Sequence, residues 1–444
     1  MGFKIGLLGL GTVGTGVSEV FANPLGRHPL LQEMKIVKVG VRSLEKIRSL
    51  SLPPALLITD LEAIVHDPAI DIVVEVMGGL EPARSLILAA IAQGKHVVTA
   101  NKAVIARHGA EIFAAATQAG VYVMIEAAVA GGIPVIQPLK ESLGANRIHT
   151  LMGILNGTTN YILTQMQQSG AAFTDVLAEA QQLGYAEADP TADVDGLDAG
   201  DKIAILAALA FGGRIDLEQV HREGIRQVSV ADINYARNLG FVIKLLAIAK
   251  LSPGTSTTAD TSFPSQLEVR VHPTLVPLEH PLASVNDVFN ALLIEADPLG
   301  QVMFLGPGAG AGPTASAVVA DLINIAALLK TGLVANDPET PRIHPLLACS
   351  HEQYCTIAPM ANLVTRFYAR FLTKDHPGVI GKLGTVFGDH GVSLESVVQT
   401  GVKAGLAEIV VVTHHVQEGN FHHALSEIRS LAAIDSIPSM LRVL

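Results

Sequence analysis

The sequence predicts an α/β protein of two or three domains, and three observations support this prediction. A short apolar strand, a glycine-rich turn and a helix open the chain, as in a Rossmann-type dinucleotide-binding domain. From about residue 364 the expected elements follow the order βαββαβ of a ferredoxin-like module. The 444 residues exceed what one core holds, and 49% hydrophobic residues with only 4% aromatic ones are typical of α/β domains.

The N-terminal strand "KIGLL" (residues 4–8) leads into "GLGTVG", which has the spacing G-x-G-x-x-G. A helix is expected over residues 13–21 and a second strand over residues 36–41. The first glycine permits a tight turn, the second lets the backbone approach a pyrophosphate, and the third lets the helix pack close to the strand. The predicted cofactor-binding residues of this loop are Gly9, Gly11, Thr12, Val13 and Gly14.

The second strand is followed by Arg42, in "VRSLEK". Dinucleotide folds that use NAD carry an acid near this point, which binds the ribose 2′-hydroxyl. An arginine suits the 2′-phosphate of NADP instead. The sequence therefore favours NADP(H) over NAD(H).

Polar residues and glycines gather where the next predicted strands end, in "DIVVEVMGG" (71–79), "HVVTAN" (96–101) and "VYVMIEAAVAGG" (121–132). Ligands of open α/β sheets lie beyond the carboxyl ends of the strands. Lys102 directly follows one of these strands, so we single it out as a candidate active-site group. The other candidates at these ends are Glu75, Gly78, Gly79, Thr99, Asn101 and Glu126. Of these, Gly78 and Thr99, together with Lys102, are predicted to bind the cofactor.

The segment "GYAEADPTADVDGLDAGDK" (184–202) concentrates acids in a chain with only 16% charged residues. Asp198 and Lys202 are four residues apart around the start of a helix expected over residues 201–211, so they share a face. An acid beside a lysine keeps it charged, and a charged lysine donates a proton to an oxygen that gains negative charge when hydride reaches a carbonyl. Glu187 and Asp193 would bind a cationic group such as an α-amino group. Together with a nicotinamide site, the segment predicts a dehydrogenase of an amino-acid alcohol or aldehyde.

Other classes of protein fit the sequence poorly. The acidic segment does not match a calcium-binding EF-hand loop, because counted from Asp193 its glycine falls at position 4 and Ala204 stands where the final glutamate is needed. A net charge of −11 argues against nucleic acid as a partner. The charge-free stretch 298–320 is rich in glycine and proline, so we expect a loop followed by a helix and no membrane span. With no apparent signal peptide and only Cys349 and Cys355 as cysteines, we expect a cytoplasmic protein.

Residues 335–363 hold several prolines and little periodicity, which indicates a linker. The compact module that follows is predicted to comprise a strand at 365–371, a helix at 377–390, strands at 391–398 and 407–413, a helix at 420–432 and a strand at 438–444.

The motifs together resemble one family over nearly the whole chain, the homoserine dehydrogenases of the long, monofunctional type. The resemblance rests on "GLGTVG", "TANKAVIA", "EAAVAGGIPVI", "GILNGTTNYIL", "GYAEADPTADVDGLDAGDKIAILA" and "GPGAGAGPTASAV". The C-terminal "KDHPGVIGKLGTVFGDHGVSLESV" is similar to an ACT domain, a regulatory module that binds amino acids.

The resemblance implies a reaction, NADPH-dependent and reversible reduction of L-aspartate 4-semialdehyde to L-homoserine. It implies a cofactor domain at residues 1–133 with a returning segment near 305–335, a substrate-binding and dimerisation domain at 134–304, and an ACT domain at 364–444. An amino-acid effector, with threonine as the first candidate, and a homodimer or homotetramer are implied as well.

The resemblance also implies roles for individual residues. Lys202 would be the proton donor and acceptor, Asp198 would orient it, and Lys102 would be a second lysine near nicotinamide and substrate. Glu187 would take the substrate amino group, with Asp193 and Thr158 nearby. Gly310 matches a glycine of a cofactor loop. A monovalent-cation site for Na⁺ or K⁺, built mainly from backbone carbonyls, is implied at Glu126, Val129, Gly131 and Ile133.

Three other functions remain open at this stage. A dehydrogenase of another small aldehyde or hydroxy acid would share the cofactor half, but usually needs an Arg/His pair that the acidic segment does not offer. A non-catalytic sensor of nucleotides and amino acids would be expected to lack Lys102 or Lys202, and both are present. A structural scaffold does not explain six acids beside one lysine.

Overall fold

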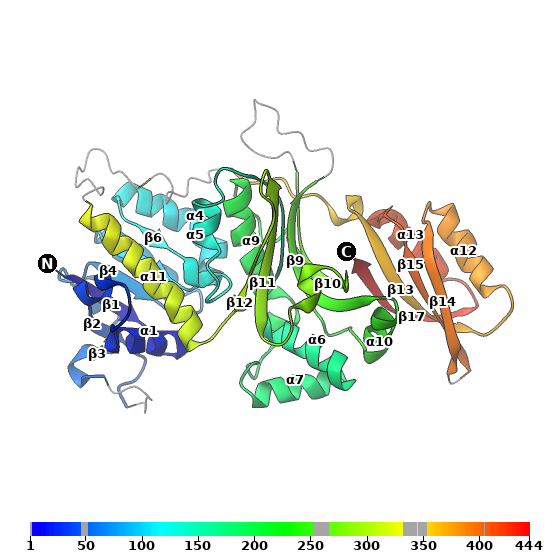
Figure 1. The fold of residues 1–444 in the computed structure, drawn as a ribbon, viewed down its shortest axis with the longest axis horizontal. Coiled ribbons are helices and arrows are strands. Elements are labelled where there is room, and N and C mark those ends of the chain that lie inside the picture. The colour runs from blue at the N-terminus through cyan, green and yellow to red at the C-terminus, as the bar shows by residue number, and fades with distance from the viewer. Residues whose placement is uncertain (1, 46–51, 253–265, 332–343, 345–352, 404) are drawn as a thin grey trace, which may run out of the picture. The chain divides into compact units, whose positions relative to one another are not determined.

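The computed structural model describes residues 2–45, 52–252, 266–331, 344, 353–403 and 405–444 (Figure 1). The chain packs as two compact units, each built from three separate stretches. Unit 1 comprises residues 1–149, 204–217 and 294–354, and unit 2 comprises residues 150–203, 218–293 and 355–444. The predicted three-domain boundaries stay a prediction, and most of the expected linker lies outside the described residues.

Unit 1 is built on a parallel six-stranded sheet in the order β3-β2-β1-β4-β5-β6. Its strands are short apolar runs, which suits a sheet buried on both faces. The order reverses between β1 and β4, and such a switch point is where dinucleotides bind in this class of fold. The strands are β1 (Phe3–Leu8), β2 (Met34–Gly40), β3 (Leu57–Ile58), β4 (Ile72–Glu75), β5 (His96–Thr99), β6 (Val123–Met124) and β12 (Gly300–Pro307), the last outside this sheet. The helices are α1 (Thr12–Ala22), α2 (Glu62–Val65), α3 (Ala83–Ala92), α4 (Lys102–Ala119), α5 (Ile136–Lys140) and α11 (Ala311–Lys330).

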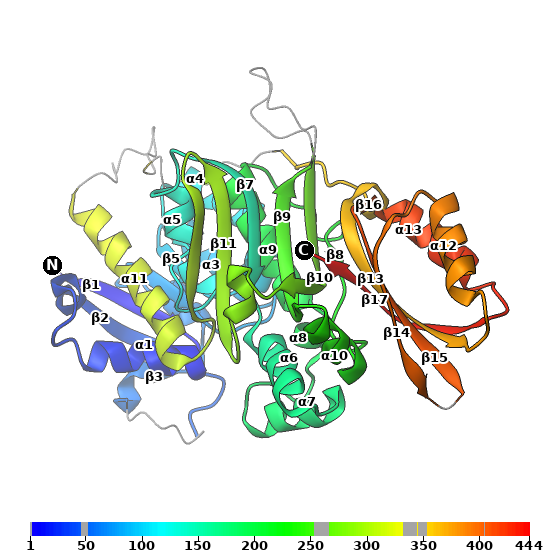
Figure 2. The same cartoon turned by 45° about the vertical axis from the view of Figure 1, so that its right-hand side comes forward.

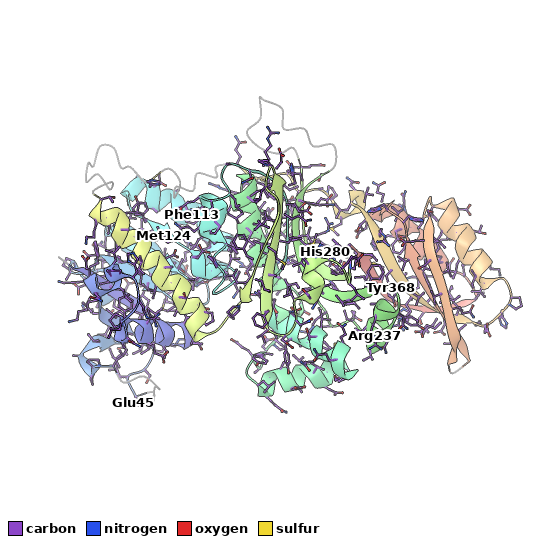
Figure 3. All side chains as sticks on the ribbon, viewed as in Figure 1. Glu45, Phe113, Met124, Arg237, His280 and Tyr368 are labelled. Atoms are coloured by element: carbon purple, nitrogen blue, oxygen red, sulfur yellow. The ribbon has the colours of Figure 1, made fainter. Side chains whose placement is uncertain are left out.

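Helix α11 returns from late in the chain to complete the core of unit 1. Gly16 of α1 allows the two helices to touch, because a Cβ there would lie 2.3 Å from the backbone oxygen of Ala311. Apolar residues of α11, among them Val318 and Leu322, join the core with Met124 of β6 (Figure 3). By length and composition α11 would also pass for a membrane span, but half of its apolar window is buried inside the protein. The sequence predicts strands within residues 269–305, and β10 (Leu267–Pro277), β11 (Phe289–Asp297) and most of β12 confirm this prediction. The overlapping expectation of a loop from residue 298 is wrong for residues 300–307, whereas the helix expected after residue 310 is present.

Unit 2 contains a mixed sheet in which the strands run in the order β11-β7-β9-β10-β17-β13-β15-β14. The elements of its first part are β7 (Arg147–Ile154), α6 (Gly157–Ser169), α7 (Phe173–Gln182), α8 (Thr191–Val194), α9 (Leu197–Phe211), β8 (His221–Arg222), α10 (Val230–Asn238), β9 (Phe241–Leu251), β10 (Leu267–Pro277) and β11 (Phe289–Asp297). Of these, α9 and β11 end in unit 1, and the first residues of β7 belong to unit 1. Strand β10 pairs in parallel with β17, so the sheet continues without a break into the C-terminal module.

The C-terminal module has the predicted βαββαβ order. It consists of β13 (Val364–Lys374), α12 (Val379–Asp389), β14 (Leu394–Lys403), β15 (Leu406–Thr413), the short β16 (Val416–Gln417), α13 (Glu418–Ile428) and β17 (Ile434–Val443). Helices α12 and α13 lie together on one face of its sheet (Figure 2). In the core between this sheet and the helices, the ring of Phe367 of β13 stacks on the ring of Phe421 of α13, with centroids 4.1 Å apart. Helix α12 begins two residues later than predicted, because Gly378 takes a left-handed φ of +89° at its N-cap.

Candidate functional site

Lys202 lies in a polar cluster at the start of α9 in unit 2. Its side chain is nearly buried, and its Nζ donates hydrogen bonds to the backbone oxygen of Leu155 at 2.7 Å and to Asp198 Oδ2 at 2.7 Å. The carboxylate and the ammonium are one helical turn apart, as the spacing predicted. Low solvent exposure strengthens such a pair and fixes the direction of the ammonium.

Helix α9 begins at Leu197, four residues earlier than predicted. The glycines and aspartates of "DGLDAGDK" favour a loop in isolation. In the folded protein these residues are nevertheless helical from Leu197 onward, and Asp198 lies inside the first turn of the helix.

Asn156 joins the acids of this cluster to each other. Its Nδ2 donates to Asp193 Oδ1 at 2.7 Å and to Asp198 Oδ2 at 2.8 Å. Its Oδ1 accepts from the backbone nitrogen of Thr159 at 2.8 Å and so caps helix α6. One buried amide thus fixes two carboxylates and a helix start, while Leu155 beside it holds Lys202. Sequence reasoning assigns Asn156 no role, although an asparagine between a strand and "GTTN" is a recognisable N-cap signal.

The remaining predicted substrate residues flank the cluster within unit 2. Thr158 Oγ1 donates to the backbone oxygen of Tyr185 at 2.7 Å, which ties the start of α6 to the beginning of the acidic segment. The side chain of Glu187 is exposed, and its backbone oxygen accepts from Gln181 at 3.0 Å. Asp193 is half-buried. The solvent exposure of these acids therefore rises from the buried Asp198 through the half-buried Asp193 to the exposed Glu187.

The glycine loop of unit 1 has the close contacts that a dinucleotide-binding turn needs. A Cβ on Gly14 would lie 2.1 Å from the backbone oxygen of Gly9, and Gly9 itself has a φ of +108°. Gly11 is the N-cap of α1, and a Cβ placed on it would have no atom within 4 Å, so its backbone faces open space. Thr12 and Val13 form the first turn of α1, where backbone N–H groups point along the helix axis. This arrangement accepts a pyrophosphate at the helix N-terminus.

A buried acid organises the carboxyl ends of β4 and β5. Thr99 Oγ1 donates to Glu75 Oε2 at 2.6 Å, and the backbone nitrogen of Asn101 donates to Thr99 Oγ1 at 3.0 Å. Asn101 caps α4 through the backbone nitrogen of Val104, and Lys102 is the first residue of that helix. Burial raises the pKa of Glu75 despite the hydrogen bonds it accepts. The network fixes the backbone from which Lys102 projects.

Three further predicted cofactor residues lie on exposed turns of unit 1. Arg42 is exposed just beyond the end of β2, where a ribose-binding side chain is expected. Gly78 follows β4 with a φ of +76°. Gly310 has a φ of +122° and is the N-cap of α11. Both glycines hold conformations that other residues rarely adopt.

Glu126 occupies a buried turn, η3 (Glu126–Ala128), at the predicted cation site. Its carboxylate accepts from the backbone nitrogens of Val135 at 2.6 Å, Ile136 at 2.8 Å and Gln137 at 2.8 Å. These three backbone donors hold both oxygens of the carboxylate in place. The other residues predicted for the cation site, Val129, Gly131 and Ile133, follow η3 in the chain. Gly131 has a φ of +56°, and a Cβ there would lie 2.2 Å from the backbone oxygen of Gly308, so the position requires glycine.

Three family models and a curated relative match this chain. A family model described as homoserine dehydrogenase matches residues 134–323, one described as homoserine dehydrogenase, NAD binding domain, matches residues 9–126, and an ACT domain model matches residues 367–433. A homoserine dehydrogenase of Synechocystis sp. is 63% identical over 444 residues, which is all of both chains.

Solved structures show the same similarity. The crystal structure of a homoserine dehydrogenase from Thiobacillus denitrificans is 43% identical, with a TM-score of 0.89 over 100% of this chain and 98% of that one. A hyperthermophilic archaeal homoserine dehydrogenase in complex with NADPH is 28% identical, with a TM-score of 0.60 over 74% of this chain and 98% of that one. Since the likeness to the Synechocystis protein runs the full length of both sequences, this chain belongs to the homoserine dehydrogenase family, NAD(P)-dependent oxidoreductases that act on a CH–OH group.

Proposed function

We propose that the protein reduces L-aspartate 4-semialdehyde to L-homoserine with NADPH, reversibly, in the cytoplasmic route to threonine, methionine and isoleucine. The observation that carries this proposal is the buried pair of Lys202 and Asp198, braced by Leu155 and Asn156. Such a pair is suited to proton transfer at the oxygen of an aldehyde, which becomes the hydroxyl of the product.

Lys202 is the proposed proton donor. In the described structure, two of the three N–H donors of its ammonium meet acceptors, so the third is left for the substrate oxygen. When bound, the reduced nicotinamide supplies the hydride that adds to the aldehyde carbon. The electron pair of the C=O π bond moves to oxygen, and that oxygen takes the proton from Lys202. In the reverse direction the neutral amine of Lys202 accepts the proton from the alcohol.

The acids around Lys202 are proposed to bind and orient the substrate. Asp198 keeps Lys202 charged, while Asp193 and Glu187 offer carboxylates to the α-amino group. Thr158 positions the acidic segment through Tyr185. In unit 1, Lys102 is proposed as the second active-site lysine, and its placement depends on Glu75 and Asn101. A Na⁺ or K⁺ ion would be held by the carbonyls of Glu126, Val129, Gly131 and Ile133, and would stabilise that turn.

Arg42 is proposed to select NADPH over NADH. The archaeal relative binds NADPH, and an exposed arginine beyond β2 matches a 2′-phosphate. We expect Arg42→Ala to raise KM for NADPH by about tenfold, the loss of one charge-assisted phosphate contact, with KM for NADH little changed. Steady-state kinetics with both cofactors measures this. Arg27→Ala, an exposed arginine in the same unit, is the matched control, and an equal change with both cofactors would contradict the role.

The C-terminal module is proposed to bind an amino-acid effector, threonine, and to inhibit the enzyme by it. The module has a hollow of about 470 Å³ lined by the β13–α12 turn, including Asp375, Gly378 and Val379, and by Gln399. The N-terminus of the eleven-residue α12 offers backbone N–H groups to a carboxylate, and Asp375 offers a partner for an amino group. A homodimer or homotetramer is proposed as the working assembly.

The test is the oxidation of NADPH, followed by its absorbance, with aspartate 4-semialdehyde and with or without L-threonine. We expect turnover that threonine inhibits. Turnover that threonine does not change would overturn the effector proposal and keep the enzyme. Folded protein that binds NADPH but reduces only another aldehyde would overturn the substrate.

A further inference from the structure

Two buried arginines of the C-terminal module contact one segment of the preceding part of unit 2. The segment comprises residues 221–238, from β8 to the end of α10, and is called the connector below. Arg442 of β17 is 2% exposed, and its Nη1 and Nη2 each donate to Glu223 of the connector at 3.0 Å. Its Nε also donates to Glu418 of α13 at 3.0 Å. Arg442 is therefore shared between the connector and the module.

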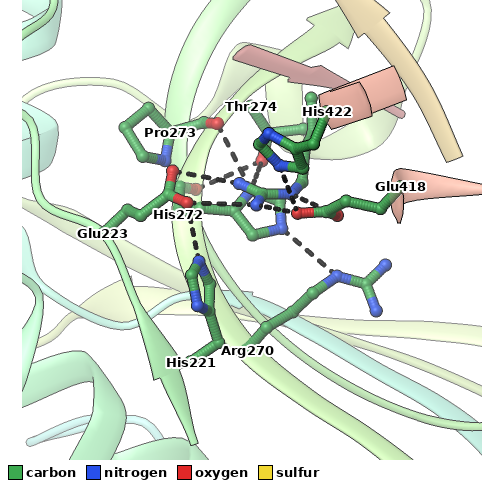
Figure 4. A network of polar contacts seen from close by, with 9 residues as sticks. His221, Glu223, Arg270, His272, Pro273, Thr274, Glu418 and His422 are labelled. Carbon is green, nitrogen blue, oxygen red and sulfur yellow. Dashed lines mark hydrogen bonds and ion pairs between the residues drawn. The ribbon is translucent and has the colours of Figure 1, made fainter. Parts of the chain in front are cut away.

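Arg442 is paired with two carboxylates of opposite charge, which stabilises its contact with the connector. Burial alone would raise the pKa of Glu223, but hydrogen bonds from His221 and Arg442 outweigh it and hold that pKa well below its usual range. The pKa of Glu418 is lowered in the same way by His422 and Arg442. Figure 4 shows Glu223 and Glu418 facing each other across the network, with His221 and His422 at its edges. Both carboxylates are ionised at neutral pH, so the guanidinium is paired on two sides.

His272 closes the network without adding charge. Burial and the two neighbouring arginines, Arg442 and Arg270, lower the pKa of His272 well below its usual value. Arg270 Nε donates to its Nε2 at 3.2 Å, so the ring proton is on Nδ1 and is shared with Thr274 Oγ1 at 2.9 Å. A neutral histidine here leaves the Arg442–Glu223 pair without a competing cation.

The connector in turn holds the acidic segment of the active centre. A Cβ on Gly224 would lie 2.1 Å from the backbone oxygen of Val194, so the two backbones are in direct contact. The backbone nitrogen of Ile225 donates to that same oxygen at 2.8 Å. Arg226 Nε donates to Asp195 Oδ1 at 2.5 Å. These contacts fix residues 194–195, which directly follow Asp193.

A second arginine secures the far end of the connector. Arg370 of β13 donates through Nε to Asp232 Oδ1 at 2.8 Å and through Nη2 to Ser229 Oγ at 3.1 Å, at the start of α10. Tyr368 of the same strand donates to Asp232 at 3.1 Å. The connector is thus attached to the C-terminal sheet at both ends, with the active-centre contacts between.

We propose that Arg442 and Glu223 are positioning residues for the protein carboxylates that bind the substrate. The C-terminal module holds the connector, and the connector holds Asp193 and its neighbours in place. The proposal rests on the proposed role of Asp193 in substrate binding. Neither Arg442 nor Glu223 needs to contact the substrate. Removing their pairing would loosen the substrate side of the site and leave the cofactor side unchanged.

The test uses the full-length enzyme with Glu223→Gln and Arg442→Lys. Glu223→Gln keeps the shape but removes the charge, and Arg442→Lys keeps the charge but loses the fork that spans two carboxylates. Glu427→Gln, on the same helix as Glu418 and paired with His390, is the control outside the network. We expect KM for homoserine to rise about fivefold or more in both variants, with KM for NADP within about twofold and the control unchanged.

Hydrogen exchange measured by mass spectrometry supplies a readout that does not depend on activity. Amides of residues 184–200 are expected to exchange faster in Glu223→Gln and Arg442→Lys than in the wild type or Glu427→Gln. Unchanged exchange there overturns the positioning role. A general rise in exchange with equal loss of homoserine and NADP affinity also overturns it, since that is the result of a merely structural contact. If exchange became faster only in residues 184–200 while the KM for homoserine stayed unchanged, the connector would be shown to hold this segment. The role of Asp193 in substrate binding would then be refuted.

Discussion

Lys202→Ala is expected to lower kcat by about 10²- to 10⁴-fold, the range that a positioned general acid contributes. The ammonium is nearly buried and already oriented by Leu155 and Asp198, so neither water nor a neighbouring group replaces it at the same point. The measurement is steady-state turnover in both directions together with NADPH affinity by fluorescence titration. Cofactor affinity should stay near the wild-type value, because the glycine loop belongs to unit 1.

Asp198→Asn serves as the companion variant. It keeps the shape of the side chain and a hydrogen-bond acceptor for Lys202, yet removes the negative charge that favours the ammonium. A smaller loss of kcat than in Lys202→Ala is the expected result for Asp198→Asn. If Lys202→Ala lost folding and cofactor affinity together, or kept its turnover, the assignment of the proton donor would be wrong.

Gly14→Val is expected to abolish measurable NADPH binding. Even the first carbon of the new side chain would meet the backbone oxygen of Gly9 at 2.1 Å, and backbone does not yield as a flexible side chain would. Either the glycine turn or α1 must shift, which moves the phosphate-binding N–H groups and costs about 1–3 kcal/mol or more in stability. Fluorescence titration with NADPH and thermal unfolding measure the two effects.

Variants at two other glycines distinguish an effect on stability from an effect on NADPH binding. Gly384→Ala lies in α12 of unit 2 with open space around its added carbon, so its stability and NADPH binding should match the wild type. Gly11→Ala should fold normally, since its φ is −85° and nothing is within 4 Å, but should weaken NADPH binding because the methyl group takes the space of the pyrophosphate. Normal NADPH binding by Gly14→Val would refute the loop as the cofactor site.

Local sequence patterns predict the helices, strands and turns that are determined by neighbouring residues in the chain. The order of elements in the C-terminal module and the strand–turn–helix at the N-terminus follow from apolar periodicity and glycine spacing, and both are present. Residues 300–305 fall in a stretch predicted as strand and in an overlapping stretch predicted as loop, because glycines and prolines flank the apolar "VMFL"; they form part of the half-exposed strand β12. The predicted start of α9 is too late for a different reason, since the glycines and aspartates of "DGLDAGDK" favour a loop locally, whereas the chain is helical from Leu197 in the folded protein.

The candidate site also contains some contacts that local patterns predict and others that they do not. The pairing of Asp198 with Lys202 is predictable because four-residue spacing on a helix guarantees proximity. Asn156 escapes prediction because its two acid partners lie 37 and 42 residues away, and no spacing rule connects them. The Arg442–Glu223 pair joins residues 219 positions apart and is invisible in the sequence for the same reason.

The late return of α11 also constrains how the chain is made. Unit 1 starts at the N-terminus, yet Gly16 of α1 packs against Ala311 and the core of the unit includes residues up to Ala326. During synthesis the first three hundred residues therefore emerge with an apolar face of the N-terminal unit still uncovered. The cofactor-binding half acquires its native core only when translation has passed α11, so α1 and the strands around it depend on a segment that is synthesised much later.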